Sequence, residues 1–467
     1  MSAEILSSDV IDRLQHILMD KQAILTDESE CWAYGYDNSK RQALPAGVVF
    51  PTSHQQVKDI VVLCNKNSIP ITARGRGTGT TGATVPTRGG LVLSLEKMNH
   101  IQTVDSANRY MVVEPGVLNQ QVQEQAARHG FFWPPDPSSA AYCTIGGNLA
   151  YNSAGPRAVK YGTPRENTLG LRAVTGDGQE IRTGVYTTKG VVGYDLTRLL
   201  IGSEGTLAII TEATLKLTPL AESKRTMQAI YKDIESATAA VSAIMAQPVI
   251  PCALEFIDGQ SIEMIRTYSS ADLPQQAGAM LMIEVDGPEH CIEKSMDTVA
   301  AVAKNNGLLS LVLANTEEEI NSLWATRKAL SPALRTVAPK KINEDIVVPV
   351  SNLPALVRGL DSLAKEFDIR IVNFGHAGNG NLHTNILYDP ADEKQNSNAH
   401  KCLDRLFSLV LSLNGTLSGE HGVGLEKMDF IDREIEPVTL ELMRRIKKQF
   451  DPNGILNPGK MLPETRR

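Results

Sequence analysis

Apolar and polar positions alternate with two different periods along the chain. Near the amino terminus apolar residues recur every three or four positions, which predicts an amphipathic helix over residues 10–18. A second helix is predicted after Ser53, because Gln56 three residues later completes a capping pattern ahead of further apolar positions at helical spacing. The apolar run 69–73 then predicts a strand, which ends in a glycine-rich stretch at residues 74–82.

The next part of the first half predicts strands around one long irregular segment. Its expected elements are strands at 91–95 and 110–113, a helix at 117–129 closed by Gly130, and a glycine turn with a β-rich run at 202–217. Residues 132–162 are crowded with Pro, Gly, Ser and Asn. An irregular segment of this length in a compact domain usually has a function.

The pattern changes near Leu220, where we place a domain boundary. Beyond it, short strands alternate with amphipathic helices, which predicts an α+β layer. The expected elements are strands at 254–257, 280–285, 346–350, 369–374 and 382–387 and helices at 235–245, 316–330 and 438–450.

Composition narrows the class of protein. A chain of 467 residues is expected to form two or three domains, and no apolar segment reaches the length of a membrane helix. The net charge of −7 argues against a nucleic-acid partner, which would require clustered Lys and Arg. Six scattered cysteines without a secretory leader predict thiols in a reducing cytoplasm.

The glycine-rich stretch contains G-x-G-x-x-G at Gly77, Gly79 and Gly82. A nicotinamide-binding Rossmann unit would need a helix after the third glycine, and Pro86 with the following Gly89-Gly90 pair prevents it. What is left is a loop of unhindered N–H groups flanked by arginines, which suits a pyrophosphate. A plain tight turn is the alternative.

Three motifs in order resemble the FAD domain of the vanillyl-alcohol oxidase / PCMH flavoprotein superfamily. They are the glycine loop, the Pro-rich segment 134–148 that ends in Thr-Ile-Gly-Gly-Asn, and Gly-Ser-Glu-Gly-Thr-Leu at 202–207. The resemblance implies noncovalent FAD, since no histidine lies between His54 and His100. The FAD-binding residues it implies are Arg74, Gly75, Arg76, Gly77, Thr78, Gly79, Thr80, Gly82, Pro135, Asp136, Ser139, Thr144, Gly146, Gly147, Asn148, Ser153, Gly155, Gly205, Ile209, Ile210 and Asn457.

Three of the nine histidines fall within two short glycine-bearing segments, 375–383 and 418–424. His376 and His383 flank a Gly-Asn-Gly turn between two predicted strands, so a hairpin could bring both imidazoles to one metal ion. Glu420 could add an anionic ligand and leave an open position, as in catalytic metal sites. Histidines that are only hydrogen-bonded at a turn are the alternative.

The two segments resemble the D-lactate, glycolate and D-2-hydroxyglutarate dehydrogenase group of the same superfamily. By that resemblance His376, His383 and Glu420 bind a divalent metal, with zinc expected, and His421 removes the hydroxyl proton as hydride passes to flavin N5. From its residue type His421 could also be a fourth ligand or a capping residue.

The same resemblance implies an arginine for the substrate carboxylate, and Arg327 matches its position. An arginine on a solvated helix face is the alternative. Hydroxyglutarate enzymes tend to carry a lysine where this chain has Asn343, which favours a monocarboxylate, although Lys340 or Lys341 could take that role if the alignment is shifted.

The sequence therefore predicts an α+β protein. A PCMH-type FAD-binding domain (1–220) precedes an α+β substrate or cap domain with a mainly antiparallel sheet and the metal site (221–430), and a C-terminal helical segment (431–467) returns to the FAD domain.

The predicted reaction is FAD- and metal-dependent oxidation of a small D-2-hydroxy acid, D-lactate foremost, to the 2-oxo acid. Glycolate, D-2-hydroxyglutarate and a noncatalytic FAD-binding subunit of an oxidase complex are the alternatives. The sequence leaves the electron acceptor open among a quinone, a cytochrome, an electron-transfer flavoprotein and oxygen. A homodimer and a cytoplasmic location, peripheral at the inner membrane, are compatible with the sequence.

Overall fold

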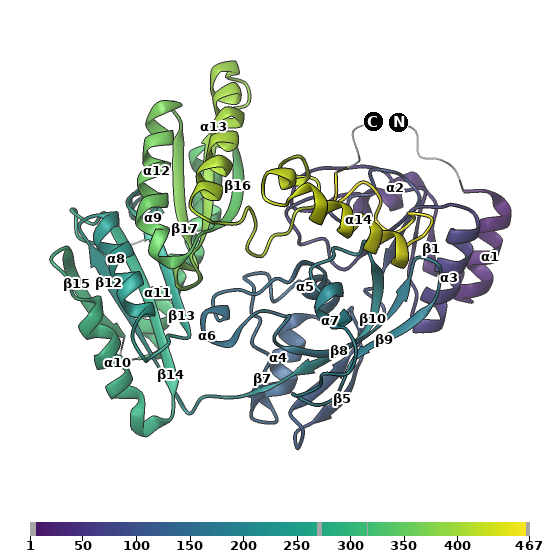
Figure 1. Cartoon of the computed structure of the whole chain (residues 1–467), viewed down its shortest axis with the longest axis horizontal. Helices are drawn as coiled ribbons and strands as arrows, with labels where there is room; N and C mark the ends of the chain where they lie inside the picture. The colour runs from purple at the N-terminus through teal and green to yellow at the C-terminus, as the bar shows by residue number, and fades with distance from the viewer. Residues whose placement is uncertain (1–5, 269–272, 315, 464–467) are drawn as a thin grey trace. The chain divides into compact units, whose positions relative to one another are not determined.

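A computed structural model describes residues 6–268, 273–314 and 316–463, which form two compact units (Figure 1). Unit 1 comprises Met1–Gly155, Gly162–Leu220 and Glu420–Arg467, and unit 2 comprises Pro156–Tyr161 and Ala221–Gly419. The expected cap domain ended at residue 430, but the chain leaves unit 2 after Gly419. The reason is that backbone N–H groups of residues 423–425 bond to Glu204 and Thr81 of unit 1.

The first sheet of unit 1 has the order β1-β2-β4-β3, in which β2, β4 and β3 run parallel. Its strands are β1 (Ile24–Leu25), β2 (Gly47–Val49), β3 (Ile71–Arg74) and β4 (Leu91–Ser94). Helices α1 (Ser8–Leu18) and α3 (His54–Lys66) pack on it through apolar faces buried in one core. As predicted, the Ser53 side chain caps α3 by accepting from the N–H of Gln56 at 3.3 Å.

The second sheet of unit 1 is antiparallel, with the order β5-β6-β10-β8-β9. Its strands are β5 (Ile101–Asp105), β6 (Tyr110–Val113), β8 (Thr168–Thr175), β9 (Glu180–Gly184) and β10 (Ala208–Lys216). A second core forms between this sheet and helices α4 (Asn119–Ala127) and α5 (Ile145–Tyr151), with Trp133 fully buried in it. Other helices and strands of unit 1 are α2 (Glu28–Cys31), β7 (Phe131–Phe132), α7 (Leu196–Leu200), β11 (Thr218–Pro219) and α14 (Pro437–Phe450).

Unit 2 is built on a seven-stranded sheet with the order β15-β12-β14-β13-β17-β18-β16, in which all neighbouring strands are antiparallel. The strands are β12 (Ser223–Tyr231), β13 (Ala253–Asp258), β14 (Ala279–Gly287), β15 (Leu308–Ala314), β16 (Lys340–Val347), β17 (Arg370–Gly375) and β18 (Asn381–Tyr388). The antiparallel sheet agrees with the predicted fold class.

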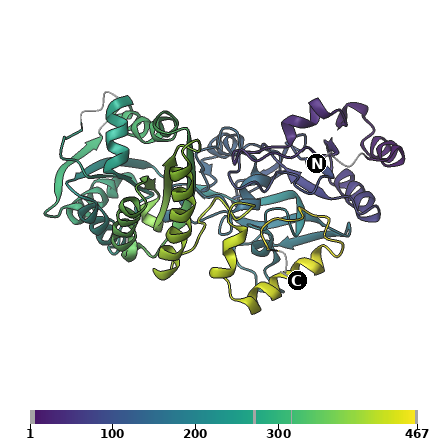
Figure 2. The same cartoon turned by 90° about the horizontal axis from the view of Figure 1, so that it is seen from above.

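Helices lie on both sides of these strands, as Figure 2 shows from above. The helices of unit 2 are α6 (Ala158–Tyr161), α8 (Ile234–Met245), α9 (Gly259–Tyr268), α10 (Glu289–Ala303), α11 (Glu317–Val337), α12 (Leu353–Glu366) and α13 (Glu393–Ser412). Helices α9 and α11 contact each other, and their apolar residues share a core with Ile257, Phe374 and Leu387 of the sheet. Because side chains alternate along a strand, these three residues identify the face of the sheet that α9 and α11 cover.

Two element predictions need correction. The strand expected at 346–350 is β16, which begins at Lys340 and ends at Val347, because its first half is polar and escapes a search for apolar runs. The segment 132–162, expected to be irregular, contains α5 and α6. Thr144 caps α5 by accepting from the N–H of Gly147 at 3.3 Å, which stabilises a helix in spite of two glycines in its first turn.

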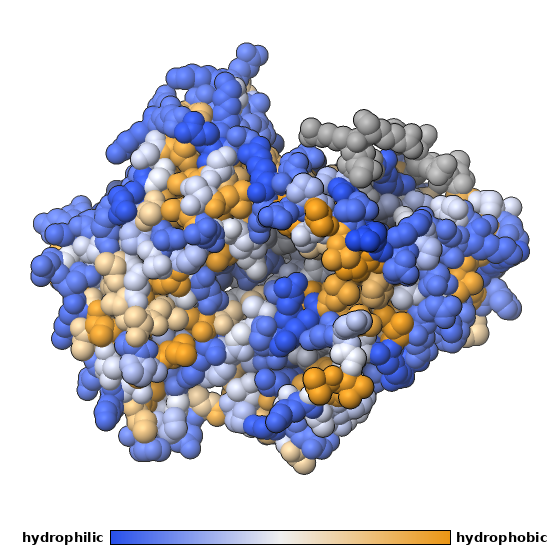
Figure 3. Space-filling view, in the orientation of Figure 1, coloured by the Kyte–Doolittle hydropathy of each residue, from blue (hydrophilic) through white to orange (hydrophobic). Residues whose placement is uncertain are grey.

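Among the described residues, none of the helices combines the length and the apolar character that crossing a membrane would require. Figure 3 draws one face of the molecule, on which polar residues predominate and apolar residues gather in several patches.

Candidate functional site

The glycine loop of unit 1 connects β3 to the rest of the first sheet without forming a helix. Gly77 and Gly82 adopt φ angles of 65° and 78°, which favour glycine. Within the described part of the chain, the N–H groups of residues 75–81 donate to no protein acceptor. A row of such donors fits the pyrophosphate of a dinucleotide, as the motif predicted.

A second cofactor segment lies directly against this loop. A Cβ added to Gly75 would lie 2.3 Å from Thr144 Oγ1, so the two segments are in van der Waals contact only because residue 75 is glycine. On the other side of α5, a Cβ at Gly146 would lie 2.7 Å from the Cβ of Pro115. The structure therefore brings together two of the motifs that the sequence analysis assigned to FAD.

Buried amides hold the rest of this segment in place. Asn119 donates from Nδ2 to the carbonyl of Pro135 at 3.0 Å and to Oδ1 of Asn148 at 3.1 Å. The N–H of Asp136 donates to Ala154 at 2.9 Å. Sequence analysis did not single out Asn119, although a polar residue on the buried face of a predicted helix is the signal that could have found it. Ser139, Gly147, Ser153 and Gly155 lie on the same segment.

The last cofactor candidates lie beside these segments in unit 1. Strand β10 pairs with β6 only from Ala213 onward, whereas Ile209 and Ile210 pair with Val174 and Ala173 of β8 and have buried side chains. The contact of their backbone with FAD stays a prediction. Asn457 is buried and donates from Nδ2 to the carbonyls of Ala83 at 2.9 Å and Glu204 at 2.7 Å.

The two arginines of the loop have different environments. Arg74 is buried, donates from Nη1 to the carbonyl of Tyr36 at 2.7 Å, and lies over the ring of Tyr34. Burial lowers the pKa of this guanidinium. Arg74 therefore bonds the loop to residues 34–36, whereas the side chain of Arg76 is half exposed, with Nη1 4.0 Å from Glu96. That Arg74 and Arg76 bind FAD stays a prediction.

In unit 2, β17 and β18 form the predicted hairpin, and the turn between them brings His376 and His383 together. Their Nε2 atoms lie 3.4 Å apart, and the rings are perpendicular. Two nitrogens bound to one tetrahedral zinc ion at about 2.05 Å would be about 3.3 Å apart. Without an ion, one neutral ring would donate to the other. The chemistry of the donor pair and its spacing fit a divalent metal.

A buried carboxylate that sequence analysis missed orients this pair. Glu255 of β13 is 1% exposed, and its Oε1 lies 2.5 Å from Nδ1 of His376. The bond fixes Nδ1 as the protonated nitrogen and directs the lone pair of Nε2 away from Glu255. Burial alone would raise the pKa of Glu255, but His376 and Arg327 outweigh it and hold this pKa well below its usual range.

The other oxygen of Glu255 holds the predicted substrate arginine. Oε2 accepts from Nε of Arg327 at 3.0 Å, and the guanidinium lies 4.7 Å from the ring centre of Phe374. Arg327 is therefore not on a solvated helix face. Because Nε is used by Glu255, a substrate carboxylate would be bound by the two Nη groups.

The site residues share one face of the sheet. Phe374 pairs with His383 and with Ile257, and Asp345 of β16 also pairs with His383, so all four side chains lie on the face covered by α9 and α11. Glu255, two residues before Ile257, points the same way. Three of these four adjacent strands, β13, β18 and β16, thus present polar groups on the same face.

The segment that carries Glu420 and His421 begins on this face. Gly419 N–H donates to Oδ2 of Asp345 at 2.8 Å, and Ser418 Oγ donates to Oδ1 at 3.1 Å. Glu420 is the next residue in the chain and the first of the last segment of unit 1, where its Oε2 accepts from Gly155 N–H at 2.8 Å. His421 follows, and its carbonyl accepts from Thr81 Oγ1 at 3.3 Å.

Asn343 lies on the same face, two residues before Asp345 on β16. Its Nδ2 donates to Oδ1 of Asn385 at 2.8 Å. Nδ2 of Asn385 donates in turn to the carbonyl of His383 at 3.1 Å. This neutral pair occupies the position at which a lysine was considered for a second carboxylate, and it offers no cation there.

Comparison with known proteins decides the family. Residues 45–184 match the family described as "FAD binding domain", and residues 220–461 match "FAD linked oxidases, C-terminal domain". The chain belongs to the FAD-linked oxidases. It is 40% identical to "Glycolate oxidase subunit GlcD" of Bacillus subtilis over 93% of both chains. It is 36% identical to a "D-lactate dehydrogenase" of Archaeoglobus fulgidus over 92% of this chain and 95% of the relative.

A solved structure of 4-ethylphenol oxidase from Gulosibacter chungangensis has the same fold. It superposes with a TM-score of 0.78 over 100% of both chains at 18% identity. The oxidase family of this chain and the PCMH-type fold agree with the resemblance that the glycine loop and the two histidine segments indicated. The protein is an FAD-dependent oxidoreductase.

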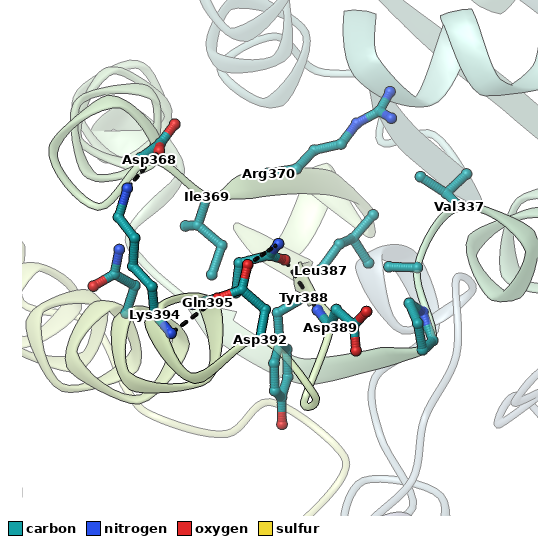
Figure 4. A pocket seen from close by; sticks show the side chains of 13 residues that line it. Val337, Asp368, Ile369, Arg370, Leu387, Tyr388, Asp389, Asp392, Lys394 and Gln395 are labelled. Carbon is teal, nitrogen blue, oxygen red and sulfur yellow. Dashed lines mark hydrogen bonds and ion pairs between the residues drawn. The ribbon is translucent and has the colours of Figure 1, made fainter.

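The described part of this FAD-linked oxidase also contains a pocket of about 510 Å³ away from the histidine pair (Figure 4). It lies at the start of β17, six residues or about 20 Å of strand before His376. Two of its charged side chains have partners: Lys394 pairs with Asp368 at 3.2 Å, and Asp392 caps α13. Of the lining residues labelled in Figure 4, Arg370 points away from Lys394 and Asp368. We assign this pocket no role in the oxidation.

Proposed function

We propose that the protein oxidises a small D-2-hydroxy acid, D-lactate foremost, to the 2-oxo acid. The observation that supports this most directly is the Arg327–Glu255–His376 chain, in which one buried carboxylate orients both a guanidinium suited to a carboxylate and an imidazole suited to a metal. Both groups near one carbon would suit the oxidation of a 2-hydroxy acid, since one would bind its carboxylate and the other would hold a metal at its hydroxyl. The names of the relatives, glycolate oxidase subunit and D-lactate dehydrogenase, support the same substrate class.

When bound, FAD would supply the hydride acceptor, and a divalent ion, with zinc expected, would polarise the substrate hydroxyl. The row of N–H groups at 75–81 would hold the pyrophosphate. His376 and His383 would hold the ion, and we propose that Glu420 completes the ligand set, because it follows Gly419, which is bonded to the residue paired with His383.

The protein's own groups then divide the work on the substrate. The Nη groups of Arg327 bind the carboxylate and fix the carbon next to it. His421 accepts the hydroxyl proton, since a neutral imidazole is the side chain best matched to that transfer near neutral pH. The Asn343–Asn385 pair is neutral, which favours D-lactate or glycolate over D-2-hydroxyglutarate, although Lys341 lies on the same face of β16.

The decisive experiment is anaerobic mixing of the purified FAD-loaded protein with D- and L-lactate, glycolate and D-2-hydroxyglutarate. We expect D-lactate to remove the oxidised flavin absorbance fastest and glycolate to remove it more slowly. After treatment with a chelator, this loss of absorbance should require that the metal is restored. His421→Ala should keep FAD and lose flavin reduction. Flavin that no 2-hydroxy acid reduces would instead indicate a noncatalytic FAD-binding subunit.

The electron acceptor is tested separately. We propose a quinone, a cytochrome or an electron-transfer flavoprotein, and stopped-flow reoxidation of the reduced flavin by each would discriminate among them. Reoxidation by oxygen alone at the turnover rate would contradict all three.

A further inference from the structure

Glu204 is a buried acidic residue of unit 1 that the proposed reaction does not use. It is 4% exposed and adopts a φ angle of 53°, a conformation that favours glycine. Its backbone is fixed among the cofactor segments: its N–H donates to the carbonyl of Ala150 in α5 at 2.9 Å, and its carbonyl accepts from Nδ2 of Asn457 at 2.7 Å. A strained backbone held from both sides indicates that the position of the side chain matters.

Both carboxylate oxygens of Glu204 accept hydrogen bonds from the segment that follows His421. Oε1 accepts from the N–H of Val423 at 2.6 Å, and Oε2 accepts from the N–H of Gly424 at 2.8 Å. Two successive backbone donors are thus bound by the two oxygens of one side chain. A glutamine could accept only one of them, because its NH2 group would face the other donor.

Neighbouring contacts hold the same segment. Gly422 has a φ angle of 83°, and a Cβ there would lie 2.6 Å from Oε1 of Glu204. Thr81 of the glycine loop donates from Oγ1 to the carbonyl of His421 at 3.3 Å and accepts from the N–H of Leu425 at 2.7 Å. The segment 421–425 is therefore bound on one side by the glycine loop and on the other by Glu204.

Burying a charged carboxylate at the position of Glu204 costs free energy. Burial raises the pKa of Glu204 to about 7, although the N–H groups of Val423 and Gly424 and the nearby Lys460 and Lys427 act in the opposite direction. Both lysines are buried as well, at 4% and 1% exposed. A neutral or apolar residue would remove this cost, so packing alone does not explain the carboxylate.

We propose that Glu204 is a positioning residue, which binds the backbone after His421 to the cofactor-binding segments of unit 1 and thereby fixes where the His421 imidazole stands. The part that concerns His421 rests on the proposed function. The part that concerns the backbone does not.

The test uses the FAD-loaded protein and two variants, Glu204→Gln and Glu204→Asp. Glu426→Gln is the matched control, because Glu426 directly follows this segment but forms a half-exposed ion pair with Arg41, whose loss should matter little. Hydrogen exchange is followed by mass spectrometry on peptides covering residues 420–425, without substrate. The rate of flavin reduction by D-lactate is then measured anaerobically over a range of D-lactate concentrations.

We expect exchange over 420–425 to be about tenfold faster in Glu204→Gln and unchanged in the control. At saturating D-lactate, flavin reduction should be about 10²-fold slower, because a misplacement of about 1 Å has that effect on a transfer between positioned groups. The D-lactate concentration that gives half of the maximal rate should change less than threefold, since Arg327 is untouched. Glu204→Asp, which keeps the charge on a shorter stem, should fall between the two.

Other results overturn the proposal. Exchange at the wild-type rate in both variants would show that Glu204 does not hold the segment. Faster exchange with unchanged flavin reduction would show that it holds the backbone without positioning His421. If the wild type itself is not reduced by any 2-hydroxy acid, the proposed function has failed, while the exchange experiment still decides whether Glu204 binds the segment. If Glu204→Gln does not fold, Glu204→Asp carries both measurements.

Discussion

Replacing Glu255 by glutamine should separate the two groups that this residue orients. Glutamine has nearly the same shape, but it has one acceptor oxygen where glutamate has two. In the structure, one oxygen accepts from Arg327 and the other from His376. In Glu255→Gln either Arg327 or His376 must therefore face the NH2 group of the amide, and both lose the charge that they share.

The magnitude follows from the burial of the residue. Removing a carboxylate that orients a metal-bound histidine typically weakens metal binding by about 10- to 100-fold. Arg327 loses its only charged partner among the described contacts, so its guanidinium should no longer be held for the substrate, and we expect the KM for D-lactate to rise by about tenfold or more. Breaking a buried ion pair also costs about 3 to 5 kcal/mol of stability, so stability must be measured alongside.

Glu284→Gln is the matched control for this experiment. Glu284 is a buried glutamate of the same sheet, on β14, and it bonds to Trp324 at 2.7 Å and Thr226 at 2.8 Å instead of to the histidine pair. Zinc affinity is measured by competition with a chromogenic chelator, and KM by steady-state turnover. If Glu255→Gln binds zinc as tightly as the wild type, or if Glu284→Gln loses as much affinity, Glu255 does not orient the metal site.

Three further predictions follow from single contacts. Gly75→Ala should purify with little FAD, measured as absorbance at 450 nm per protein, because the new Cβ would lie 2.3 Å from Oγ1 of Thr144; a full complement of FAD would refute the contact. Asn343→Lys should raise kcat/KM for D-2-hydroxyglutarate by about tenfold and leave D-lactate turnover nearly unchanged, since it supplies a cation beside Asn385; equal effects on both acids would argue against a second-carboxylate position. Burial raises the pKa of Asp258 to about 6 from 3.8, so its stabilisation is fully present below about pH 4 and is lost as pH rises through 6. Relative to Asp258→Asn, the free energy of unfolding of the wild type should fall by at most about 3 kcal/mol over that range, and parallel pH curves would contradict the shift.

Local sequence signals predicted the parts of the fold that depend on local physics. The cap at Ser53, the strand 110–113 and the hairpin around residues 376–383 agree with the structure, because a cap, an apolar strand and a Gly-Asn-Gly turn are each specified within a few residues. The polar start of β16 was missed because its exposed and half-buried residues form no apolar run, and only pairing with β18 holds them in the strand.

The residues of the candidate site differ in the same way, because some can be predicted from nearby sequence and others cannot. Histidines seven residues apart on one hairpin can be paired from sequence. Glu255 precedes His376 by 121 residues, and only the antiparallel register of β13 on β17 brings them together. Nothing local distinguishes Glu255 from a glutamate exposed on an edge strand.

A signal for such residues does exist, and it lies in the cost of burying them. Glu255, Asp345 and His383 are polar residues that lie among buried strand positions, and each is less than 9% exposed on the face that α9 and α11 cover. Burying a polar side chain costs about 1 to 3 kcal/mol unless its partners are provided, so each inward polar position needs partners that the fold supplies. Here these residues lie on β13, β18 and β16 of one sheet and point the same way. Their coincidence on one face, more than any single motif, is what makes this face of unit 2 a site rather than a core.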